Sequence, residues 1–81
     1  MAVNAVVQTA ITATGSAQPI EVPRGYHLVL HPVTNPCEFS HAAAGPWFPV
    51  LANTTVGLGE SLGQTVYLRA TAGTVINVLF T

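Results

Sequence analysis

The stretch QTVYLRATAGTVINVLFT, Gln64–Thr81, decides the fold class of this chain. It contains two runs rich in β-branched and aromatic residues, 65–70 and 74–80, which are joined by a short Thr-Ala-Gly link. Such residues favour a pleated, half-buried surface, and Gly73 can supply the positive φ that a tight turn needs. We therefore expect two strands joined as a β-hairpin.

Side chains alternate between two faces along each of these runs. In the first run, Val66 and Leu68 share one face, and Tyr67 and Arg69 share the other. In the last run, VINVLF, apolar residues occur on both faces. A strand without a clearly polar face is typical of one that is covered on both sides. We expect its own core to cover one face and a second surface to cover the other.

The rest of the chain repeats short alternating runs separated by turn signals such as Gly15-Ser16, Pro23-Arg24-Gly25 and Asn35-Pro36. Turn signals about every eight to twelve residues are typical of a small sandwich or barrel. The sequence predicts an all-β fold, a small antiparallel β-sandwich or β-barrel of about six to eight short strands. We expect residues 1–81 to form a single domain. Besides the last two runs, the expected extended segments are 2–14, 18–22, 26–33, 37–41, 50–51 and 55–58.

The composition points to self-association. The 81 residues include one cysteine, so no internal disulfide can form, and only 6% are charged, against about 25% in typical domains. A small domain with so little surface charge tends to associate. The alternative is a neutral Thr, Ser, Asn and Gln surface that is simply soluble. We expect a homo-oligomer, with a trimer slightly favoured.

The first residues are the expected site of that association. Residues 1–14 contain no charge and little that would order an exposed terminus. We interpret them as a possible strand-exchanging arm that adds to a sheet edge of its own chain or of a neighbour. A helix is the alternative, but the β-branched residues argue against it. Val3, Val7 and Ile11 are its candidate interface residues.

Several function classes find little support. Two basic residues make no basic patch for nucleic acid, and no apolar run is long enough to span a membrane. The first residues lack the basic start of a signal peptide. Ser40 and His41 are adjacent, so on a strand they point to opposite faces and cannot act as a nucleophile and its base. We expect no enzymatic activity and no cofactor.

Three histidines raise the question of a metal site. His27 and His31 are four residues apart, a separation of about 13 Å on a regular strand. If 26–33 and 37–41 pair as a hairpin, His31 lies diagonal to His41, with Cys37 farther along the same face. Without a third ligand within reach, we expect no metal site.

Trp47 and Phe48 stand between Pro46 and Pro49 on a stiff loop. Two interpretations remain open for this pair. The aromatics fold back to cap one end of the core, which is favoured in so small a domain, or they project as anchors for a partner. We include both residues among the candidate interface residues.

The last third of the chain resembles short β-rich virion proteins of tailed bacteriophages. The resemblance is to their pattern "Gly-Glu-Ser … hydrophobic-Tyr … Ala … Gly-Thr … Val-Leu", and the earlier Trp-Phe-Pro-Val at 47–50 is similar in style. The matching residues are Gly59-Glu60-Ser61, Val66-Tyr67, Ala70, Gly73-Thr74 and Val78-Leu79.

The resemblance implies a structural component of a virion, assembled in the host cytoplasm. Such a protein would be a capsid decoration or cement protein, or a head or tail accessory subunit, that contacts the major capsid protein or other virion proteins. The alternative is a β-sandwich binding module that recognises carbohydrate or a cell surface. It would use exposed aromatics, Trp47 and Tyr26.

Overall fold

The computed structural model describes residues 7–59 and 63–81, and every regular element in them is a β-strand. The described residues therefore contain no helix that could cross a bilayer. The eight strands are β1 (Val7–Thr12), β2 (Gln18–Glu21), β3 (Leu28–Pro32), β4 (Cys37–Ser40), β5 (Phe48–Val50), β6 (Val56–Leu58), β7 (Thr65–Ala70) and β8 (Val75–Phe80).

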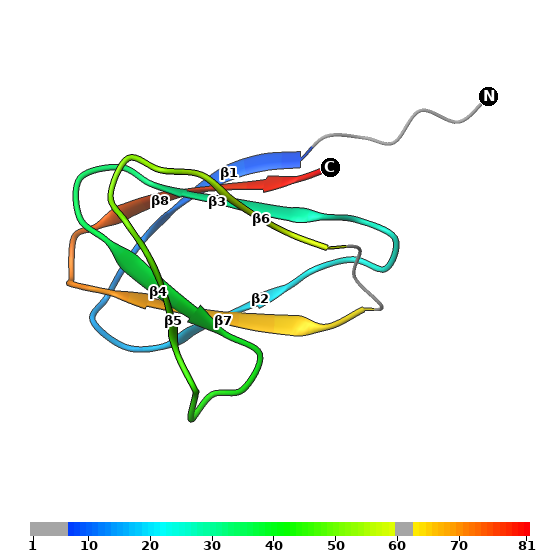
Figure 1. Cartoon of the computed structure of the whole chain (residues 1–81), viewed down its shortest axis with the longest axis horizontal. Helices are drawn as coiled ribbons and strands as arrows, with labels where there is room; N and C mark the ends of the chain where they lie inside the picture. The colour runs from blue at the N-terminus through cyan, green and yellow to red at the C-terminus, as the bar shows by residue number, and fades with distance from the viewer. Residues whose placement is uncertain (1–6, 60–62) are drawn as a thin grey trace.

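The strands form two antiparallel, four-stranded sheets that pack face to face (Figure 1). Sheet A has the order β1-β8-β3-β6 and is the upper layer of Figure 1, and sheet B has the order β2-β7-β4-β5 and is the lower layer. The all-β prediction is confirmed, and the architecture is a sandwich.

The predicted hairpin of β7 and β8 is wrong. The two strands occupy nearly the predicted residues, but β7 belongs to sheet B and β8 to sheet A. Their link crosses the edge of the sandwich, where the Gly73 N–H donates to the Ala13 carbonyl at 2.8 Å and the Thr74 N–H to the Thr71 carbonyl at 3.0 Å. Gly73 does adopt a positive φ, 91°. A short link with such a glycine suits a crossing between sheets as well as a hairpin, so local signals did not separate the two.

The same correction applies to β3 and β4, which lie in sheets A and B respectively and do not form a hairpin. Among the described strands, β4 and β5 are the one consecutive pair whose members bond to each other. Eight strands in two such sheets, connected largely from one sheet to the other, form a jelly roll.

The core lies between the sheets and consists of the side chains that the alternation placed inward. Leu28 and Leu30 of β3 face Leu68 of β7, and Ile76 and Val78 of β8 complete the centre. Ile20 and Val22 are buried as expected, and Glu21 between them is exposed.

Candidate interaction surfaces

The outer side of sheet A carries the first candidate surface. Leu28, Leu30, Ile76 and Val78 point inward, so the residues that alternate with them in β3 and β8 point outward. Together with one residue of β1, they define what we term the sheet A face: Ala10, Val29, His31, Asn77 and Leu79.

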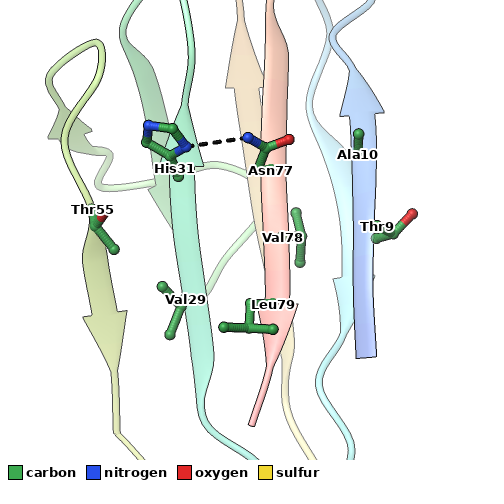
Figure 2. Close-up of a pocket in the computed structure, with 8 residues that line it drawn as sticks. All are labelled: Thr9, Ala10, Val29, His31, Thr55, Asn77, Val78 and Leu79. Atoms are coloured by element: carbon green, nitrogen blue, oxygen red, sulfur yellow. Dashed lines mark hydrogen bonds between the residues drawn. The ribbon is translucent and has the colours of Figure 1, made fainter. Parts of the chain in front are cut away.

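An open groove of about 580 Å³ runs along the sheet A face, and Figure 2 shows the side chains that line it. Val29 and Leu79 are register partners and supply its apolar floor, and both are only partly buried. The groove is lined by Thr9, Ala10, Val29, His31, Thr55, Asn77, Val78 and Leu79.

His31 is the polar centre of this surface. Its register partner on β8 is Asn77, whose Nδ2 lies 3.2 Å from His31 Nδ1 (Figure 2). On the other side of the ring, His31 Nε2 lies 3.4 Å from Asn53 Oδ1. When the Asn77 amide donates to Nδ1, Nε2 is the ring nitrogen that can donate to the Asn53 side-chain oxygen. The ring is thus oriented by two amides, from β8 and from the β5–β6 turn.

The sheet A face has no formal charge. The charged residues that the structure describes are Glu21, Arg24, Glu38 and Arg69, which lie in β2, the turn after it, β4 and β7. All three strands belong to sheet B. The two layers therefore differ: sheet B carries the charged strands, and the outer side of sheet A is neutral.

The outer side of sheet B holds a three-residue stack. Glu38 and Arg69 are register partners on β4 and β7, and Arg69 Nε donates to Glu38 Oε1 at 2.7 Å. The Arg69 guanidinium carbon also lies 4.1 Å from the centre of the Trp47 ring, within the range of a cation–π interaction. Arg69 thus joins a carboxylate and an aromatic ring on one surface.

Gly45 leaves room for the Trp47 ring at this position. A Cβ atom on residue 45 would lie 2.7 Å from Trp47 Cδ1, so a side chain there would collide with the indole. Gly45 also has a φ of 89°, which glycine adopts readily. The absence of a side chain at residue 45 therefore lets the indole edge lie against the backbone.

The aromatic pair divides between the two sides of sheet B. Phe48 is the register partner of Phe39 on the inner side, their ring centres lie 5.5 Å apart, and Phe48 remains 50% exposed. Trp47, its neighbour, lies on the outer side over Arg69. The two aromatics therefore lie on opposite sides of sheet B, and both keep part of their surface exposed.

The other candidate interface residues lie in or before β1. Val3 is outside the described residues. Val7 is the first residue of β1 and the register partner of Phe80. Ile11 pairs with Ile76, is partly buried and packs against the core. The described part of the arm is therefore an integral strand of sheet A in its own chain.

The histidines do not come together. Because β3 and β4 lie in different sheets, His31 is not placed diagonally to His41, and it contacts Asn77 and Asn53 instead. No group of three or more potential metal ligands is present in residues 7–59 and 63–81. Cys37 is buried, and desolvation, with the nearby Glu38 charge, raises its thiol pKa to about 11.

Comparisons with known proteins bear on the fold. No protein-family model matches the chain, and no curated protein matches significantly. Among solved structures, the chain is similar to a de novo designed double-stranded β-helix determined by solution NMR, with a TM-score of 0.60. The likeness covers 95% of this chain and 96% of the designed chain at 15% identity. The chain has a double-stranded β-helix fold. At this identity the likeness concerns the fold alone, and activity must be argued from the surfaces.

Proposed function

We propose that this protein is a non-enzymatic structural subunit of a virion, a capsid decoration or cement subunit or a head or tail accessory subunit. It acts by protein–protein contacts and docks through the sheet A face on the major capsid protein or another virion protein. The observation that carries the proposal is the neutral, partly apolar sheet A face, which spans the central strands β3 and β8.

The chemistry of this face suits burial against a protein. Interface cores are depleted of charged residues, and Val29 and Leu79 supply apolar area at the middle of the face. The polar groups of His31 and Asn77 already bond to each other. Covering them therefore costs less than covering unpaired polar groups, which would lose water without a replacement partner.

The fold is compatible with this role without deciding it. Jelly rolls occur in viral capsid proteins and also in lectins and cupins, so the architecture serves several functions. The virion assignment itself rests on the resemblance of the last third of the chain. Assembly in the host cytoplasm follows from that assignment.

The carbohydrate-binding alternative has weaker support from the side chains that it needs. Sugar stacking requires a free aromatic face, and Arg69 occupies one face of Trp47. Tyr26 is partly buried and packs against the core. Both residues are only partly exposed, which supports this alternative less than two fully exposed rings would.

Localisation in the particle tests the role. Electron microscopy and quantitative mass spectrometry of purified virions produced with this chain should find it at stoichiometric positions on the head or tail. A particle that assembles fully without the chain, and never contains it, would overturn the proposal.

Variants test the docking face. Leu79→Glu places a charge on the sheet A face and should strongly reduce incorporation into the particle. Ala72→Glu is the matched control, because it adds the same charge at an exposed position in the β7–β8 link. Equal incorporation of the two folded variants would show that docking uses another surface.

A further inference from the structure

The four edge strands of the two sheets differ in how accessible their free backbone edges are to another strand. Both edges of sheet B contain a proline, Pro19 in β2 and Pro49 in β5. Proline lacks a backbone N–H, so it blunts an edge against strand addition. In sheet A, β6 has three residues with Gly57 at its centre, whereas β1 has six, VQTAIT, with no proline and no charge. β1 is therefore the long, unprotected edge among the described strands.

Backbone hydrogen bonds show which residues of β1 have free groups. The Ala13 N–H donates to the Thr74 carbonyl at 2.8 Å, toward the β8 side. Bonding direction alternates along a strand, so Thr9 and Ile11 also bond to β8. The other end of β8 agrees with this pattern. His27 and Thr81 exchange two backbone hydrogen bonds, so Thr81 and every second residue before it bond toward β3, and the residues of β8 between them bond toward β1. The N–H and C=O groups of Gln8, Ala10 and Thr12 therefore point away from the sheet.

We propose that the free edge of β1 binds β1 of a second copy of this chain. The two strands run antiparallel about a two-fold axis at Ala10, which joins the two A sheets into one continuous sheet. This register pairs Ala10 with itself and Gln8 with Thr12 of the second copy. It bonds the outward groups of all three residues, whereas an axis at Thr9 would place Thr12 opposite residue 6, outside the described residues.

The residues of β1 allow this self-contact. In an antiparallel two-fold pair, β1 lies beside a second copy of itself. A charged side chain in β1 would therefore lie close to the same charge on the second copy. β1 has none. Thr9, Ala10 and Thr12 are exposed and small, so two backbones can approach closely. An uncharged self-complementary edge thus fits a second copy without repulsion.

The inference deepens the proposed function by naming the self-contact, and it can fail on its own. The pair forms from the isolated chain and uses the edge of sheet A, leaving the sheet A face available for a virion protein. A two-fold pair also differs from the trimer favoured by composition, so the mass of the assembly distinguishes them.

The first test blocks the edge. In Ala10→Pro, the lost N–H is one that points away from β8, so the β1–β8 ladder keeps its bonds. Light scattering at micromolar concentration should find twice the chain mass for the wild type and for the matched control Ala10→Ser. The Ala10→Pro variant should have a single chain mass with an unchanged circular dichroism spectrum.

The second test holds even if Ala10→Pro fails to fold. Residues in a hydrogen-bonded antiparallel pair have Cα atoms about 5.5 Å apart, which a disulfide can bridge. Ala10→Cys should therefore give a cross-linked dimer under mild oxidation. Ala72→Cys, exposed in the β7–β8 link, should not. A wild-type monomer, a trimer, or equal cross-linking of the two cysteine variants would overturn the proposal, while virion localisation would still test the function separately.

Discussion

The Arg69 guanidinium carbon lies 4.1 Å from the centre of the Trp47 ring, while Arg69 Nε donates to Glu38 Oε1 at 2.7 Å. This arrangement connects β7, β4 and the loop before β5 on the outer side of sheet B. Both charged side chains are about two-fifths exposed, 42% and 41%, so solvent screens their attraction. The stack fastens the edge of sheet B to its centre with modest energy.

Arg69→Ala should lower the free energy of unfolding by about 1 kcal/mol, because it removes a part-exposed cation–π contact and a surface ion pair. Arg24→Ala is the matched control, since Arg24 is exposed in the turn after β2 and has no ion pair among the described residues. Urea unfolding at low and high salt measures the free energy of unfolding of both variants. Equal losses in the two variants would show that the stack contributes nothing.

Leu30→Ala should lower the free energy of unfolding by about 2 to 5 kcal/mol, because it opens a cavity among core side chains. Leu30 is fully buried at 0% exposure, whereas Leu51 is 69% exposed. Leu51→Ala should therefore change stability by less than about 0.5 kcal/mol. Thermal melting of both variants tests the pair, and a similar loss for Leu51→Ala would contradict the assigned core.

Gly73→Ala should destabilise the fold by about 1 to 2 kcal/mol, since an L-residue resists the left-handed backbone region. Gly73 has a φ of 91°, and nothing lies within 4 Å of the position a Cβ would take. Gly57 has the same open space without a positive φ. Gly57→Ala should therefore be neutral or slightly stabilising, through the unfolded state. Chemical denaturation should separate the two, and matching losses would rule out backbone strain as the cause.

Cys37 should make stability fall at high pH. Burial, with the Glu38 charge, raises the folded thiol pKa from its ordinary 9.0 to about 11. The unfolded chain therefore loses this proton first as the pH rises. The raised thiol pKa of Cys37 contributes about 3 kcal/mol to the free energy of unfolding. This stabilisation is fully present below pH 9 and is lost as the pH rises through about 11. Cys37→Ala should flatten this part of the unfolding curve against pH; the same slope in the variant would contradict the assignment.

The candidate surfaces were only partly predictable from the sequence. Apolar residues on both faces of the last strand predicted a second covered side, and in the described chain that outer side is an open groove with Val29 and Leu79 as its floor. The His31–Asn77 contact was not foreseen, because these residues are 46 positions apart and meet only through the β3–β8 register. The Glu38–Arg69 pair was missed for the same reason, since no local pattern pairs β4 with β7.

The sequence by itself determined most of the strands and the alternation of their faces, although it placed Phe48 in a loop and the structure places it in β5. Alternation is a local property, so Val66 and Leu68 could be placed on one face before any pairing was known, and the structure buries both. The tertiary structure alone decided that β7 and β8 belong to opposite sheets. A short link with a glycine at positive φ permits either a hairpin or a crossing, and the choice depends on which distant strands bond at each edge. Burial of both inner faces in one core settles that choice, and it involves the whole chain at once.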